Sequence, residues 1–224
     1  MVTARRLPRP VGAVILDMDG TLLDTESIYI RTFLETAATL GHPLQDSFLH
    51  SLIGLPGGDF QSRLRAHLGE EFPYVEHRRM YLARRTELLD QGIVIKPGAL
   101  ELLDHLEATR TPMAIATAAT RANAEDYLRR AGMRDRFAVV LTRDDVENSK
   151  PNPDLFLRAA AGIGIAPEHC VGVEDSHNGV RSAHAAGMMT IMVPDIVAAS
   201  DEIRTLCVVV VDSLHDVRRL VGGV

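Results

Sequence analysis

The chain of 224 residues is poor in several features, and these shortages exclude some classes of protein. It has only two cysteines, Cys170 and Cys207, and they show no metal-ligand spacing. No apolar run approaches the roughly 20 residues of a membrane-spanning helix, and the apolar stretch 11–16 is too short for a secretion signal. We therefore expect a reduced, cytoplasmic protein that does not interact with membranes.

Positive charge is also scarce, because 24 basic residues face 30 acidic ones and the formal net charge is −6. Nucleic-acid binding needs clustered positive charge, so a large nucleic-acid interface is disfavoured. An anionic ligand would have to be held by local groups rather than by the field of the whole molecule. Of the basic residues 22 are arginine, and the only lysines are Lys96 and Lys150.

The hydrophobic fraction of 46% is typical of a folded globular chain. Short apolar runs alternate with segments of helical period from residue 98 onward, and the runs themselves show no polar alternation, which is typical of buried parallel strands. The predicted strands are 13–16, 113–117, 138–141, 170–173, 190–193 and 207–211. The predicted helices are 98–109, 121–131, 152–162, 179–186 and 214–221. This order predicts an α/β fold with a doubly wound parallel sheet, whose ligands bind beyond the carboxyl ends of the strands.

Residues 24–96 interrupt this alternation with a purely helical pattern. Helix-breaking residues at Asp24-Thr25 and at Lys96-Pro97-Gly98 mark the linkers. We expect a core domain of residues 1–23 and 97–224 and an inserted α-helical bundle of residues 24–96. Its predicted helices are 27–40, 46–53, 59–68 and 74–89.

Two carboxylates follow the first predicted strand in the sequence Asp17-Met18-Asp19-Gly20-Thr21. Like charges this close repel, so both stay ionised only when they share a cation or a proton. A single aspartate here could be a turn or helix-cap residue, but the pair directly after a buried strand favours a functional site.

A second acidic pair, Glu174-Asp175, follows the fourth predicted strand. Taken alone it could be a surface turn. Together with Asp17 and Asp19 it offers the all-oxygen environment that magnesium prefers.

Thr117 ends the second predicted strand, and its hydroxyl with the N–H groups of the following turn could bind phosphate oxygens, although threonine is also a common helix N-cap. Lys150 precedes Pro151 in a chain whose other basic residues are nearly all arginine, and it either supplies a compact positive charge to the site or is a surface lysine without a role. His177 and His184 have no partner in a nucleophile motif, and we expect them on helix surfaces or caps.

In this order the motifs Asp17–Thr21, Thr117, Lys150-Pro151 and Glu174-Asp175 resemble the four motifs of the haloacid dehalogenase superfamily. The helical insertion after the first motif resembles the cap of its β-phosphoglucomutase-like phosphatase subfamily. The resemblance extends from about residue 11 to residue 221 and implies a Rossmann-like core, a cap domain and Mg²⁺ as cofactor.

The resemblance also implies catalytic roles. Asp17 would be the nucleophile that forms an aspartyl-phosphate, and Asp19 would act first as general acid and then as general base. Thr117 and the N–H of Ala118 would hold the phosphoryl oxygens, while Lys150 would neutralise them.

The implied metal ligands are Asp17, the backbone carbonyl of Asp19, Glu174 and Asp175. Magnesium and Lys150 would remove the repulsion between a carboxylate nucleophile and a phosphate dianion.

The resulting prediction is a monomeric, magnesium-dependent phosphomonoester hydrolase for a small phosphorylated metabolite, with sugar phosphates as the default. A β-phosphoglucomutase-type phosphomutase is the alternative, but the loop 52–59 has no basic residue for a second phosphate, and Tyr29 stands where such mutases carry histidine. Dehalogenases lack the second aspartate, and phosphonate-cleaving members need a lysine that residues 24–95 do not contain. A signalling receiver would be about half as long and would carry its acidic pair after the first strand, with the phospho-acceptor aspartate later. This chain instead places Asp17-Met18-Asp19 first and inserts a helical cap after it.

Overall fold

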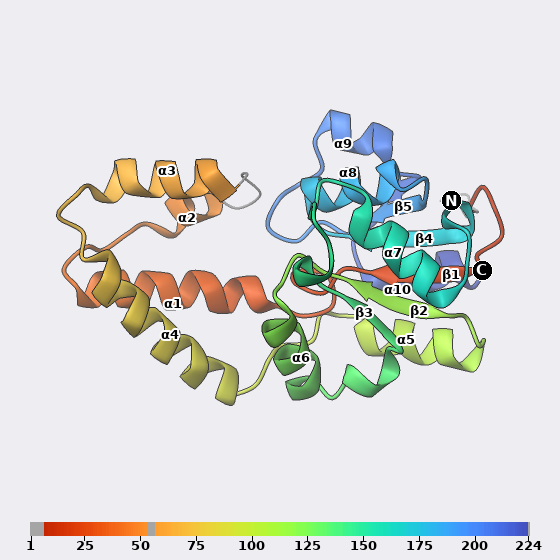
Figure 1. Cartoon of the computed structure of the whole chain (residues 1–224), viewed down its shortest axis with the longest axis horizontal. Helices are drawn as coiled ribbons and strands as arrows, with labels where there is room; N and C mark the ends of the chain where they lie inside the picture. Colours follow the sequence, from red (N-terminus) through yellow and green to blue (C-terminus); the bar gives the residue numbers. More distant parts are fainter. Residues whose placement is uncertain (1–6, 53–56, 224) are drawn as a thin grey trace. The chain divides into compact units, whose positions relative to one another are not determined.

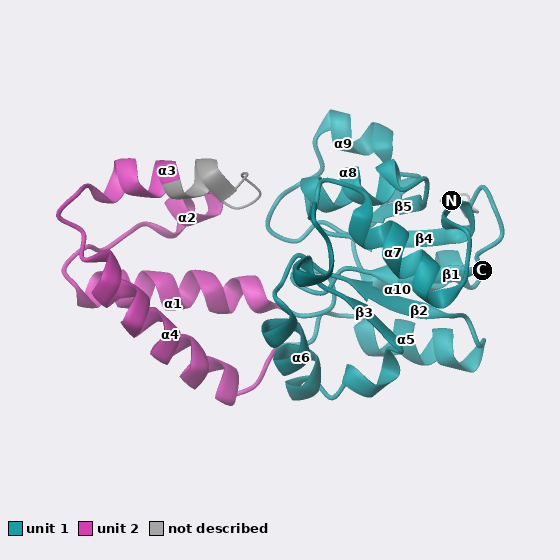
Figure 2. Ribbon diagram, viewed as in Figure 1, with its two compact units in different colours: residues 1–23, 94–224 teal, residues 24–93 magenta. Residues whose placement is uncertain are grey.

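The structure is a computed structural model that describes residues 7–52 and 57–223. It divides into two compact units, Met1–Leu23 with Val94–Val224, and Asp24–Ile93 (Figure 2). The sequence placed the second boundary after residue 96. Residues 94–96 belong to the first unit because Ile95 pairs with Leu23 and the N–H of Lys96 donates to the carbonyl of Leu22 at 2.9 Å.

The first unit is built on a six-stranded sheet in the order β3-β2-β1-β4-β5-β6, in which all pairs are parallel (Figure 1). This confirms the doubly wound α/β prediction. The strand order reverses between β1 and β4, whose neighbouring ends include the pair Leu16 and Val173. Ligand sites form at such a reversal. The strands are β1 (Ala13–Leu16), β2 (Met113–Ala116), β3 (Val139–Leu141), β4 (Cys170–Glu174), β5 (Met189–Met192) and β6 (Val209–Val210).

Helices connect the strands. A buried cluster joins Ile15 of β1 to Phe156 and Ala159 of α7 and to Ala183 of α8, so these two helices cover one face of the sheet. The helices of this unit are α5 (Ala99–Ala108), α6 (Arg121–Arg130), α7 (Asp154–Ile163), α8 (His177–Ala185), α9 (Asp201–Leu206) and α10 (Leu214–Val221).

Helix α9 was not predicted from the sequence. Its six residues are too few to show a helical period, yet Ser200 caps it by accepting from the N–H of Ile203 at 3.3 Å, and the Ile203 side chain is fully buried. The predicted last strand, 207–211, is reduced to Val209–Val210 at the edge of the sheet.

The second unit contains α1 (Thr25–Thr39), α2 (Asp46–Leu52), α3 (Gly57–Leu68) and α4 (Tyr74–Asp90), as the helical pattern predicted. Helices α1 and α4 pack through an aromatic cluster in which the rings of Phe33 and His77 lie 4.4 Å apart and Tyr29 stacks edge-on against Tyr81 at 5.8 Å. His77 Nε2 also hydrogen-bonds Thr36 Oγ1 at 3.0 Å. Part of the loop 52–59, namely residues 53–56, lies outside the described residues.

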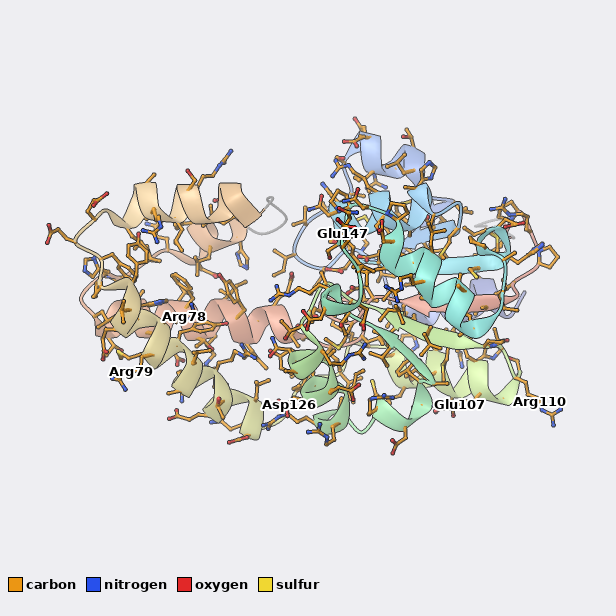
Figure 3. All side chains as sticks on the ribbon, in the orientation of Figure 1. Arg78, Arg79, Glu107, Arg110, Asp126 and Glu147 are labelled. Carbon is orange, nitrogen blue, oxygen red and sulfur yellow. The ribbon has the colours of Figure 1, made fainter. Side chains whose placement is uncertain are left out.

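Arg78 and Arg79 on α4 are exposed (Figure 3), whereas Arg84 and Arg85 of the same helix are half-buried. Arg79 forms a bidentate pair with Glu76, and Arg78 is exposed beside it, which agrees with a solvated surface. None of the helices within residues 7–52 and 57–223 combines the length and apolar content that a bilayer-spanning segment requires.

Candidate active site

The carboxyl end of β1 presents the first acidic pair. Asp17 directly follows the strand, its N–H donates to the carbonyl of Val173 at 3.0 Å, and its residue is only 5% exposed. The chain then turns at Gly20, whose φ of +78° favours glycine and whose N–H donates to Leu23. Because of this turn, Asp17 and Asp19 both stay at the edge of the sheet.

Lys150 joins the ends of β1 and β4. Its ammonium group donates to Asp17 Oδ1 and to Glu174 Oε1, and its side chain is only 5% exposed. Burial alone would lower the pKa of Lys150, but the two adjacent carboxylates outweigh burial and raise it. Lys150 is therefore a fixed positive charge between two carboxylates, which excludes the alternative of a surface lysine.

The negative charges of the site exceed this one positive charge. Burial raises the pKa of Asp17 well above its usual range, Lys150 lowers it in part, and the charges of Glu174 and Asp19 raise it again. Asp17 and Glu174 share the ammonium group of Lys150, and the carboxylate of Asp175 lies beside them. A divalent cation would compensate this excess and would keep Asp17 ionised.

Three carboxylates could hold such a cation. Asp17, Glu174 and Asp175 each offer an oxygen, and these oxygens lie within 4.8 Å of one another. Thr21 Oγ1 donates to Asp175 Oδ1 at 3.2 Å, and Ser176 Oγ donates to Glu174 Oε2 at 3.1 Å, so two of the three are oriented by hydroxyl groups. A buried donor set of oxygens alone fits magnesium.

Asp19 does not belong to this group of three carboxylates. Its Oδ2 instead accepts a hydrogen bond from Thr117 Oγ1 at 3.2 Å. The Asp19 carboxylate therefore lies on the side of the site where β2 ends.

Two glycines allow close approaches to the acidic residues. A Cβ atom at Gly20 would lie 2.3 Å from Asp175 Oδ2, and one at Gly179 would lie 1.9 Å from the Glu174 carboxyl group. Any side chain at these positions would displace the carboxylates.

The loop after β2 holds Thr117, which is fully buried and donates its N–H to Leu141 at 2.9 Å. Thr117 Oγ1 accepts from the N–H of Ala119 at 3.0 Å, and Ala118 between them is exposed at the turn. The N-cap of α6 is Thr120, whose side chain accepts from Asn123, so the cap alternative does not apply to Thr117.

The structure thus gathers Asp17, Lys150, Glu174 and Asp175 in one group and places Asp19 and Thr117 in direct contact with each other. No separate role was predicted for Thr21, which lies within the first motif, or for Ser176, which directly follows Glu174-Asp175. His177 and His184 bond the backbone carbonyls of Ala198 and Leu206, at 2.9 and 3.0 Å, as anchoring side chains do.

A cavity of about 270 Å³ within the second unit is unrelated to this chemistry. It lies between α1 and α4, and Arg84, which lines it, pairs with Glu35 and Glu87. The charged side chains that line the cavity already form ion pairs, so we assign no catalytic role to them.

Comparison with known proteins identifies the family of the chain. Residues 14–193 match the haloacid dehalogenase-like hydrolase family. Over 183 residues the chain is 34% identical to the fructose-1-phosphate phosphatase YqaB of Escherichia coli, covering 79% of this chain and 93% of that protein.

Two crystal structures have the same architecture. A hydrolase of this family from Deinococcus radiodurans, with bound phosphate and sodium, has a TM-score of 0.83 at 26% identity and covers 96% of each chain. A CbbY variant from Rhodobacter sphaeroides in complex with xylulose-(1,5)bisphosphate has a TM-score of 0.75 at 28% identity and covers 91% of this chain and 95% of that one. The chain belongs to the haloacid dehalogenase-like hydrolases.

Proposed function

We propose that this chain is a magnesium-dependent phosphomonoester hydrolase that acts on a small phosphorylated sugar through an aspartyl-phosphate at Asp17. The observation that carries the proposal is the buried group at the β1–β4 reversal, where Lys150 bridges Asp17 and Glu174 beside Asp175. It combines a carboxylate, a fixed cation and an all-oxygen metal site within one hydrogen-bonded group.

In the first step an Asp17 carboxylate oxygen attacks phosphorus, the bond from phosphorus to the sugar oxygen breaks, and Asp19 gives its proton to that oxygen. Lys150 and the loop of Thr117 and Ala118 bind the transferring phosphoryl oxygens. When bound, the magnesium ion offsets the repulsion between Asp17 and the phosphate dianion.

In the second step Asp19, now ionised, takes a proton from water, and the water oxygen attacks the phosphorus of the aspartyl-phosphate. The bond between phosphorus and the Asp17 oxygen breaks, which releases inorganic phosphate and restores the carboxylate. Asp19 is then protonated and ready for the next turnover.

The substrate class rests on the relatives, because one is named a fructose-1-phosphate phosphatase and another binds xylulose-(1,5)bisphosphate. A phosphomutase acting on a sugar bisphosphate intermediate is the alternative that the same core chemistry would allow. We place the enzyme in the cytoplasm, which agrees with its two unpaired cysteines, and we propose that it is a monomer.

A magnesium-supported screen of phosphorylated sugars tests the proposal, with p-nitrophenyl phosphate as a general substrate and β-glucose 1-phosphate with its bisphosphate activator as the mutase substrate. We expect phosphate release that requires Mg²⁺ and is lost in Asp17→Asn. Turnover without added metal, or isomerisation in place of hydrolysis, would contradict it.

A further inference from the structure

Lys96 and Asp195 form a largely buried ion pair that the proposed mechanism does not use. Lys96 Nζ donates to Asp195 Oδ1 at 2.5 Å, and the two side chains are 21% and 19% exposed. Lys96 precedes α5, and Asp195 lies in the loop that follows β5. Lys96 and Lys150 are the two lysines of the chain, and Lys96 lies outside the group formed by Lys150, Asp17 and Glu174.

The Asp195 carboxylate lies next to Asp175, one of the proposed metal ligands. One of its oxygens is within 4.8 Å of an oxygen of Asp175, a spacing at which one water molecule can hydrogen-bond to both groups. Magnesium keeps several of its waters when it binds to a protein. Carboxylates that hold such waters commonly orient the site without contacting the ion.

Both sides of this arrangement are fixed by the fold. The N–H of Lys96 donates to the carbonyl of Leu22 at 2.9 Å, which ties it to the turn that follows Asp19. The loop that carries Asp195 is held farther along by His177, which bonds the carbonyl of Ala198 at 2.9 Å. The ion pair therefore joins two segments that are each anchored near the acidic residues.

We propose that Lys96 and Asp195 are a positioning pair for the magnesium site. Asp195 accepts a hydrogen bond from a water molecule of the ion's shell, and Lys96 fixes the Asp195 carboxylate and offsets its repulsion from Asp175. The inference rests on the proposed function, because it takes Asp175 as a metal ligand.

Isothermal titration calorimetry of MgCl₂ into the full chain tests this pair, with folding of each variant checked by circular dichroism. We expect Asp195→Asn to raise the Kd for Mg²⁺ about tenfold. The matched control is Asp126→Asn, which removes a carboxylate paired with Arg130 at 2.9 Å on α6 and leaves the Kd unchanged (Figure 3). If Asp195→Asn does not fold, Asp195→Ser provides the same comparison.

A double-variant cycle tests the role of Lys96. In a Lys96→Met background, Asp195→Asn should change the Kd less than twofold, because the carboxylate is no longer fixed; a full tenfold effect there would show that Lys96 positions nothing. An unchanged Kd in Asp195→Asn overturns the inference alone. Absence of Mg²⁺ binding by the wild-type chain would overturn the proposed function and the inference together.

Discussion

Asp145 links the loops after β2 and β3, and its removal should lower stability by an amount that the structure allows to be worked out. Its Oδ2 accepts from Arg121 Nη2 at 2.5 Å, from the N–H of Thr142 at 2.8 Å and from Thr142 Oγ1 at 2.7 Å. Burial opposes the shift, but the hydrogen bonds of Arg121 and Thr142 outweigh it and lower the pKa of Asp145 from 3.8 to about 2. By linkage, such a shift stabilises the folded protein by at most about 2.4 kcal/mol at neutral pH.

The side chain of Asp145 is 28% exposed, so solvent screening reduces this upper limit to about 1–2 kcal/mol. Because the folded-state pKa is depressed, the contribution is fully present above the unfolded pKa near 4 and is lost as the pH falls toward 2. About half of it should remain at pH 3.

Urea unfolding of Asp145→Asn and wild type measures this difference. We expect the free energy of unfolding of the variant to be about 1–2 kcal/mol lower than that of the wild type at pH 7. This difference should be smaller at pH 3. Glu202→Gln is the control, since its exposed pair with Arg181 should contribute nothing measurable. A gap of the same size at both pH values would refute the electrostatic explanation.

Three further predictions concern substitutions of single residues. Burial lowers the pKa of His77, so the wild type should lose stability as the pH falls below about 6.5, and thermal unfolding of His77→Phe should show less of this loss. Gly179→Ala, whose Cβ would overlap the Glu174 carboxyl group, should weaken Mg²⁺ binding at least tenfold by calorimetry, and unchanged binding would contradict the packing argument. Lys150→Met should lower kcat by about 100-fold or more in steady-state assays, because Asp17 loses its fixed cation; activity within a few-fold of wild type would contradict that role.

The sequence was sufficient to predict where the polar residues gather. Asp17 and Glu174 each directly follow an apolar run, and parallel strands bring such ends to one edge of the sheet. The contact between Asp19 and Thr117 also follows once β1 and β2 are neighbours.

The remaining features depend on contacts between segments far apart in the sequence. Lys96 and Asp195 lie 99 residues apart, and neither stands at the end of a predicted strand, so only the folded loops reveal their pairing. Similarly, Thr120 rather than Thr117 caps α6. Which of the two threonines is the cap depends on where the helix begins, and the sequence alone does not show this. Helix α9 was missed because its burial rests on Ile203 in a segment too short for a periodic signal.

The most direct test of the account is to locate the covalent phosphate. Asp19→Asn, which lacks the general base for the second step, is incubated with Mg²⁺ and p-nitrophenyl phosphate, an ester whose leaving group needs no general acid. Intact-mass measurement followed by peptide mapping should find one phosphoryl group, attached to Asp17, and none when Asp17 is also changed to Asn. A phosphoryl group on another residue, or none at all while p-nitrophenol is still released, would contradict the assignment of Asp17 as the nucleophile.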